Sequence, residues 1–153
     1  MGLCGFRVAY IVAPESITNV FHQTAVLFIG ATNTMAQAGI TAALKDTRFM
    51  EDMRQEWMIR ADILGSILDT IPHIRYVKPQ AGTTALVYYD YDIPSYEFCT
   101  RMYHSAGAFV TPGDCFEQPK SMRIGYAYGK EALVKGLKAV SEYFAWKEKE
   151  LEK

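Results

Sequence analysis

The spacing of apolar residues changes several times along the chain, and each spacing predicts a helix or a strand. Residues 6–13 (FRVAYIVA) are β-branched, aromatic or small except for Arg7, which predicts a buried strand that ends at Pro14. Residues 48–70 place apolar side chains near every third or fourth position, with charged residues between them. This spacing predicts one long helix, and its length favours a helix that connects two bodies.

The spacing of apolar residues elsewhere predicts further helices and strands. Helices are expected over residues 14–27, 34–44, 94–106 and 130–152, and strands over residues 76–77, 83–89, 108–111 and 123–127. After Pro72 the predicted order is therefore strands, a helix, further strands and a final helix. Such an order is typical of a compact α/β layer.

Composition narrows the function classes. The chain has 153 residues, of which 50% are hydrophobic and 22% are charged, with a formal net charge of −1. A core can be buried, and no excess of positive charge is available to bind nucleic acid or a membrane surface. No apolar run is long enough to span a bilayer, and the start lacks the features of a signal peptide. Three scattered cysteines fit a reducing cytoplasm, and the histidines are too far apart for a metal site.

Two arginines differ from the other charged residues, because each lies in an otherwise apolar predicted strand. Arg7 belongs to the first strand and Arg123 to the last one. A guanidinium in such a place must pair with a carboxylate or face an anion, since desolvating it alone is costly. Its planar fork suits phosphate or carboxylate. Two interpretations remain open at this point: anion-binding arginines, or structural salt bridges to Asp or Glu.

Three segments around these arginines resemble the motifs of class I/II aminotransferases, the fold-type-I pyridoxal-phosphate enzymes. Residues 2–10 (GLCGFRVAY) resemble the strand that follows the catalytic lysine of that family. Residues 111–116 (TPGDCF) look like its PG-x-x-F turn, with Asp114 where the family usually has Ser. Residues 121–127 (SMRIGYA) look like the strand that carries its second arginine. The three motifs occur in the family's order and spacing, and the resemblance covers essentially the whole chain.

The resemblance implies a fold and a division of the chain. It implies an α/β fold, the C-terminal fragment of a fold-type-I transferase. Residues 1–45 would be the end of the large, cofactor-binding domain, residues 46–71 the connecting helix, and residues 72–153 the complete small α/β domain.

The resemblance also implies an activity. The parent protein would be an aminotransferase that uses pyridoxal 5′-phosphate to transfer an amino group between an amino acid and a 2-oxo acid. Arg7 would pair with the cofactor phosphate and Arg123 with the substrate carboxylate. The lysine that carries the cofactor lies upstream of Met1 by the family's spacing, so no catalytic residue is assigned and the fragment is expected to be inactive alone. The parent is expected to be a cytoplasmic homodimer.

Two alternatives stay open. A related pyridoxal-phosphate decarboxylase or acyl-CoA-condensing synthase would share the fold and both arginines. A non-catalytic α/β binding module would use Arg7 and Arg123 as structural ion pairs.

Phe28 bears on substrate choice. In family members that prefer dicarboxylic substrates, an arginine of the neighbouring subunit precedes a Ser-Asn or Thr-Asn pair at a fixed spacing. Here the pair is Thr32-Asn33, and that spacing leads to Phe28. An apolar side chain there predicts that the parent disfavours aspartate and glutamate and prefers neutral or aromatic donors. The alternative is that Phe28 belongs to the core.

Overall fold

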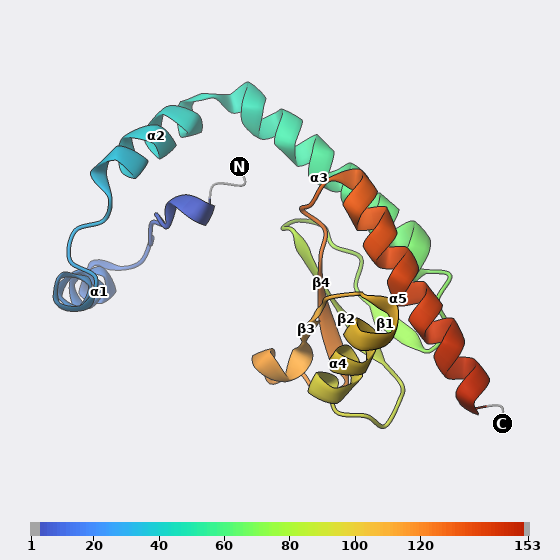
Figure 1. The fold of residues 1–153 in the computed structure, drawn as a ribbon. Helices are drawn as coiled ribbons and strands as arrows, with labels where there is room; N and C mark the ends of the chain where they lie inside the picture. Colours follow the sequence, from blue (N-terminus) through green and yellow to red (C-terminus); the bar gives the residue numbers. More distant parts are fainter. Residues whose placement is uncertain (1–3, 152–153) are drawn as a thin grey trace. The chain divides into compact units, whose positions relative to one another are not determined.

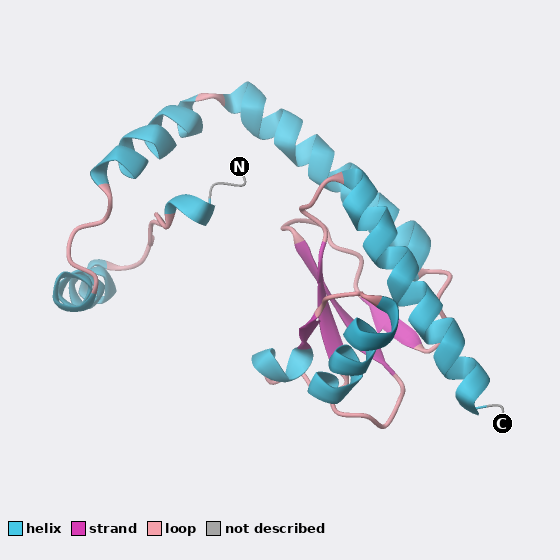
Figure 2. Ribbon diagram, in the orientation of Figure 1, coloured by secondary structure: helices cyan, strands magenta, loops and turns pink. Residues whose placement is uncertain are grey.

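A computed structural model describes residues 4–151 of the protein. Internal contacts divide the chain into two compact units, with the boundary after Met53. Helix α3 (Thr47–Leu68) therefore begins in the first unit and ends in the second. The order of helices and strands can be followed in Figure 1, and their types in Figure 2.

The first unit is helical. It contains the short 3₁₀ helix η1 (Cys4–Phe6), α1 (Glu15–Phe28), α2 (Thr34–Lys45) and the start of α3. The side chain of Asn33 caps α2, because its Oδ1 accepts a 3.0 Å hydrogen bond from the backbone N–H of Ala36. No residue of α1 is buried within the unit.

The expected strand over residues 6–13 is wrong, because residues 7–14 have no regular secondary structure. Arg7 has a φ of 56°, which lies in the left-handed region and cannot continue an extended strand. A strand also needs a hydrogen-bonding neighbour, and the strands of the described residues pair with one another in the second unit.

The second unit is an α/β layer built on a four-stranded antiparallel sheet in the order β1-β2-β4-β3. Its elements are β1 (Ile74–Tyr76), β2 (Thr84–Tyr89), α4 (Ser95–Ala106), β3 (Thr111–Pro112), η2 (Gly113–Phe116), β4 (Ser121–Gly125) and α5 (Lys130–Leu151). The predicted helices and strands of this unit are confirmed, with small shifts at their ends. The largest difference is β3, which is shorter and later than the strand expected over residues 108–111.

One face of the sheet carries the core. Alternate residues of β2 and β4, such as Val87 and Met122, are fully buried. They form one cluster with apolar side chains of α3, α4 and α5, among them Leu64, Phe98 and Leu137. Helix α4 contributes Phe98, whose ring stacks on that of Tyr89 with 4.0 Å between the ring centroids.

The opposite face of the sheet is left open by the helices of this unit. Directly opposed residues of antiparallel strands share a face, and the register pairs Leu86 with Arg123 and Arg75 with Tyr88. These side chains alternate with the buried ones, so they lie on the face that does not carry the core. Arg123 therefore stands on the open face of a well-packed sheet.

Within residues 4–151, no helix combines the length and the apolar character that crossing a bilayer requires.

Candidate functional site

Arg123 lies in the middle of β4 and is held by the strands on both sides. Its neighbours along the strand, Met122 and Ile124, are buried in the core, so alternation directs the Arg123 side chain to the open face. Leu86 of β2 is opposite on one side and Thr111 of β3 on the other. The backbone of this arginine is thus fixed by a sheet, while its side chain is half-buried.

Two side chains orient the Arg123 guanidinium. One terminal nitrogen donates a 3.3 Å hydrogen bond to Thr111 Oγ1. The ring of Phe116, from η2, lies against the guanidinium, with 4.6 Å between Arg123 Cζ and the ring centroid. A planar guanidinium on an aromatic face is a favourable cation–π arrangement that leaves the edges of the fork available.

No carboxylate of the described residues forms an ion pair with Arg123. The interpretation of Arg123 as half of a structural salt bridge is therefore wrong for this part of the chain. A guanidinium has five N–H donors, and among residues 4–151 only Thr111 accepts one of them. The arrangement can bind an oxyanion bidentately.

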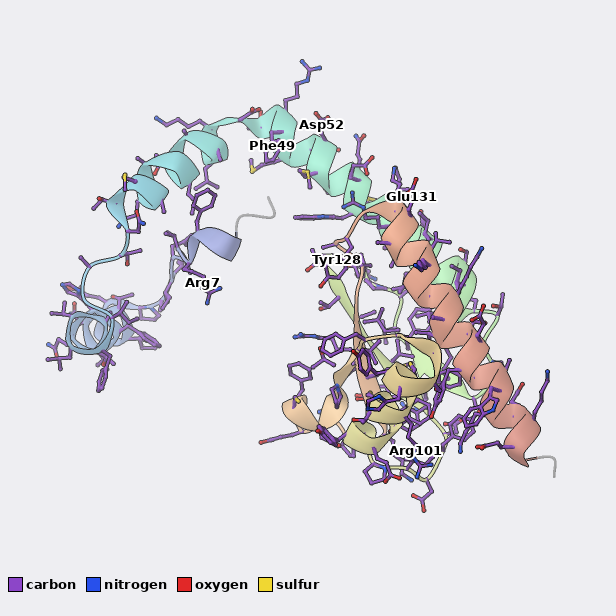
Figure 3. The ribbon with its side chains drawn as sticks, in the orientation of Figure 1. Arg7, Phe49, Asp52, Arg101, Tyr128 and Glu131 are labelled. Atoms are coloured by element: carbon purple, nitrogen blue, oxygen red, sulfur yellow. The ribbon has the colours of Figure 1, made fainter. Side chains whose placement is uncertain are left out.

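A pocket of about 260 Å³ adjoins this arginine in the second unit. Residues of β3, β4 and α5 line it, with Thr111 and Arg123 at one end and core residues such as Leu133 and Leu137 at the other. Tyr128, labelled in Figure 3, comes shortly after the end of β4.

Arg7 lies in the first unit, directly after η1, and is exposed. Figure 3 labels it, and its left-handed backbone turns the chain away from η1. Arg7 belongs to the first unit and Arg123 to the second. The roles expected for Arg7 at the cofactor phosphate and for Arg123 at the substrate carboxylate stay predictions.

Phe28 is the last residue of α1 and is 84% exposed. Its neighbours Leu27 and Ile29 are exposed as well. The alternative in which Phe28 belongs to the core of this chain is therefore wrong. Its role in substrate choice stays a prediction.

Several lysines are held by carboxylates. Four of them form ion pairs at 2.8 to 3.2 Å: Lys78 with Asp62, Lys120 with Asp92, Lys130 with Glu56, and Lys147 with Glu150. The hydrogen bond to Asp62 and the negative charge of that carboxylate raise the pKa of the Lys78 amine. Among residues 4–151, no cluster of three or more His, Cys, Asp or Glu side chains could hold a metal ion.

The family model described as "Aminotransferase class I and II" matches residues 1–140. The chain belongs to this family. Its motifs at residues 111–116 and 121–127 are the ones that form the Arg123 site, so the resemblance and the geometry agree on the same residues.

Curated relatives match over nearly the whole chain. A probable aspartate/prephenate aminotransferase of Aquifex aeolicus is 27% identical over 152 residues, covering 92% of this chain and 37% of the relative. A capreomycidine synthase of Streptomyces vinaceus is 26% identical over 156 residues, again covering 92% of this chain and 37% of the relative. The chain thus spans between a third and two fifths of the length of these relatives.

Solved structures confirm the fold. An aromatic aminotransferase from Pyrococcus horikoshii OT3 superposes with a TM-score of 0.79 at 25% identity, over 96% of this chain and 40% of that one. A PLP-dependent aminotransferase from Streptococcus suis gives a TM-score of 0.81 at 24% identity, over 94% of this chain and 38% of that one. The expected α/β fragment of a fold-type-I transferase is confirmed, and the cofactor of the family is pyridoxal 5′-phosphate.

Sequence reasoning missed two residues of the Arg123 site. Phe116 is the last residue of the PG-x-x-F motif, but nothing in that motif says that its ring lies on a guanidinium. Thr111 is the first residue of the same segment, and only the β3–β4 register brings it opposite Arg123. The signal that could have found both is the short distance in sequence between this turn and the arginine strand.

Proposed function

We propose that this chain is the C-terminal part of a pyridoxal-phosphate-dependent aminotransferase and binds the carboxylate of its amino-acid and 2-oxo-acid substrates through Arg123. One observation carries the proposal. Within the described residues, Arg123 is fixed by a sheet and oriented by Phe116 and Thr111, yet it has no carboxylate partner. An arginine kept in this state inside a folded unit is suited to a carboxylate supplied by a ligand.

The residues present fit the cofactor in part. Its phosphate is an oxyanion, and Arg7 is an exposed guanidinium in the first unit that can bind one. When bound, pyridoxal phosphate supplies the electron sink for chemistry at the α-carbon. By the spacing that the family resemblance implies, the lysine that carries this cofactor would precede Arg7 by eight positions, which lies before Met1. We therefore assign the attachment lysine to the part of the protein that the relatives have and this chain does not span.

The same proposal divides the chain into parts of two domains and the helix that connects them. Residues 1–45 belong to the large domain, residues 46–71 form the connecting helix, and residues 72–153 form the small domain. The long helix α3 and the contact boundary after Met53 both fall in or around the connecting segment, which supports this division.

The parent is proposed to be a homodimer of the cytoplasm. The first unit exposes apolar side chains that a partner subunit or the rest of the protein would cover, including Val12, Leu27 and Met35. The two cysteines whose side chains are described, Cys99 and Cys115, are free thiols, as is usual in a reducing compartment.

A second candidate function has its own support. One matched relative is named as a synthase, not as an aminotransferase. The Arg123 site accounts for carboxylate binding and leaves open which bond of the substrate reacts. A decarboxylase or a condensing synthase of the same family would use the site equally well, and analysis of the products separates these reactions.

The test uses the full-length protein that contains this chain. Arg123→Leu is expected to lower kcat/KM for amino acids by about 10- to 100-fold, mainly through KM, because a charge-assisted contact to the carboxylate is lost. Arg75→Leu is the matched control. Arg75 lies on the same open face and also over an aromatic ring, 4.3 Å from the centroid of Tyr88, but outside the proposed site.

Equal losses in both variants would show that the open face matters only for folding and would contradict the role of Arg123. The 153-residue chain alone is expected to transfer no nitrogen from an amino acid to a 2-oxo acid. Steady transfer by the chain alone would contradict the assignment of the attachment lysine to the rest of the protein.

A further inference from the structure

Helix α4 is capped by a residue from outside the helix. Pro94 occupies its N-cap position and makes no side-chain cap, so the first N–H groups of the helix need another acceptor. Asp114, in η2, supplies it: its Oδ2 accepts a 3.1 Å hydrogen bond from the backbone N–H of Tyr96. A carboxylate at a helix N-terminus is favourable both as an acceptor and for its charge. This contact ties η2 to α4.

The segment that follows η2 is tied to the sheet. Gln118 accepts a 2.7 Å hydrogen bond from the Tyr88 hydroxyl through its Oε1, and its N–H donates to the carbonyl of Gly113 at 3.0 Å. Phe116 lies between the two attachments, Asp114 on one side and Gln118 on the other. The position of its ring is therefore set by how η2 is held at both ends.

The Phe116 ring in turn limits the Arg123 side chain. A free arginine side chain loses rotamer entropy when it is ordered. Within the described residues, Arg123 is held only by the ring at 4.6 Å and by Thr111 Oγ1 at 3.3 Å. The aromatic contact is thus the larger surface that orders the guanidinium before a ligand arrives.

We propose that Asp114 is a positioning residue for the carboxylate site: by capping α4 from η2, it holds Phe116 over Arg123 and keeps the guanidinium in its binding orientation. The proposal rests on the carboxylate-binding role given above to Arg123.

A purely structural role makes different predictions. If Asp114 only stabilised α4, its removal would lower stability and leave the environment of Arg123 unchanged in the folded chain. If Asp114 positions Phe116, its removal changes the environment of Arg123 as well. The aromatic ring provides a direct readout, because a nucleus above its face is shifted upfield in an NMR spectrum.

The experiment measures the Arg123 Nε–Hε resonance of the 153-residue chain by ¹H–¹⁵N NMR, and titrates the chain with acetate. In the unmodified chain the resonance is expected upfield of arginines that face no aromatic ring, and Arg75, which lies over Tyr88, serves as an internal reference that the variants below leave unchanged. Phe116→Leu removes this shift and defines its full size. Asp114→Ala is expected to lose most of the shift and to weaken acetate binding by about three- to tenfold, the value of a cation–π contact.

Two further variants decide between the interpretations. Asp114→Asn keeps an acceptor oxygen and is expected to restore most of the shift and of the acetate affinity. Asp62→Ala is the matched control, since Asp62 is an exposed aspartate on α3 whose ion pair joins Lys78. It is expected to change neither readout.

The proposal is overturned if Asp114→Ala lowers the melting temperature but leaves the upfield shift and the acetate affinity unchanged. It is also overturned if Asp114→Asn behaves like Asp114→Ala, because the hydrogen bond is then not the cause. If acetate does not bind the unmodified chain, the carboxylate role of Arg123 fails, and the shift measurements still decide whether Asp114 positions the ring.

Discussion

Gly113 lies against Ser121 so closely that a Cβ atom on Gly113 would be 1.8 Å from Ser121 Oγ. The same Cβ would be 2.3 Å from the carbonyl oxygen of Gln118, which is backbone and cannot rotate away. The glycine of the PG-x-x-F motif is therefore required by the close approach of η2 to the start of β4.

Gly113→Ala is expected to lower the free energy of unfolding by about 1 to 3 kcal/mol, the usual effect of forcing extra atoms into a packed site. Gly136→Ala is the matched control, because Gly136 lies inside α5 with no atom within 4 Å of the added Cβ. That variant should raise the free energy of unfolding by up to about 1 kcal/mol through helix propensity. Urea unfolding followed by circular dichroism measures both, and equal signs would contradict the packing argument.

The two described cysteines should react very differently with a thiol reagent. Cys115 is exposed, whereas Cys99 is buried in the core cluster. Burial raises the pKa of the Cys99 thiol to about 12, and the negative charge of Asp114 and the nearby Cys115 contribute to the increase. The thiolate is the reactive form, so little of Cys99 is available at neutral pH.

We expect an alkylating reagent at neutral pH to label Cys115 and to spare Cys99 until the chain unfolds. Mass spectrometry of the digested protein with and without urea measures the two sites, and Cys115→Ser should remove the fast phase. Fast labelling of Cys99 in the folded chain would show that α4 is not packed as described.

Many helices and strands of the second unit could be predicted from the sequence, because each is marked by the spacing of apolar residues within its own segment. The spacing of apolar residues fixed the helices over 94–106 and 130–152 to within a few residues of α4 and α5. The strand predicted over residues 6–13 was wrong, because amino-acid composition shows that a segment could form a strand but not that another strand is available to pair with it. The geometry of the Arg123 site could not be predicted for the same reason, since it depends on contacts between separate segments. Its stacking on Phe116 depends on where η2 turns, and that turn is set by contacts with α4 that no local pattern encodes.

Stability at high pH should depend on Tyr76. Its hydroxyl donates a 2.6 Å hydrogen bond to Asp69 Oδ1, and burial, together with this bond and the charge of Asp69, raises the pKa of Tyr76 to about 12. The unfolded tyrosine loses its proton near pH 10. Between these values the folded chain binds more protons than the unfolded one, so stability falls as the pH rises. Below about pH 10 the contribution of this group is fully present.

Tyr76→Phe is expected to be less stable than the unmodified chain at neutral pH, by about 0.5 to 1.5 kcal/mol for the lost hydrogen bond. The difference should shrink as the pH approaches about 12. Tyr89, whose pKa burial also raises to about 12, remains in both chains and gives the common part of the alkaline loss. Urea midpoints across this range measure the effect, and a difference that is independent of pH would contradict it.

The chain is expected to self-associate through its first 45 residues. Leu27 is 80% exposed within a helix that has no buried residue, and apolar surface of this extent marks an interface. Leu27→Glu should shift sedimentation towards monomer. Val77→Glu is the matched control, because Val77 is equally exposed but belongs to the second unit. A clean monomer of the unmodified chain at high concentration would refute this prediction.

The last prediction concerns the choice of amino donor and follows from Phe28, which is exposed at the end of α1. If the neighbouring subunit's Phe28 faces the substrate side chain, a second carboxylate there lacks a cation and binding it is unfavourable, whereas an apolar side chain gains roughly 25 cal/mol per Å² buried. The full-length protein should therefore prefer neutral or aromatic donors to aspartate, although matched relatives are named for aspartate.

Phe28→Arg should raise kcat/KM for aspartate relative to phenylalanine by about 10- to 100-fold, the range of a charge-assisted contact. Leu27→Arg places the same cation one residue away and should not. A donor panel in which unmodified protein already acts best on aspartate would show that Phe28 does not occupy this position.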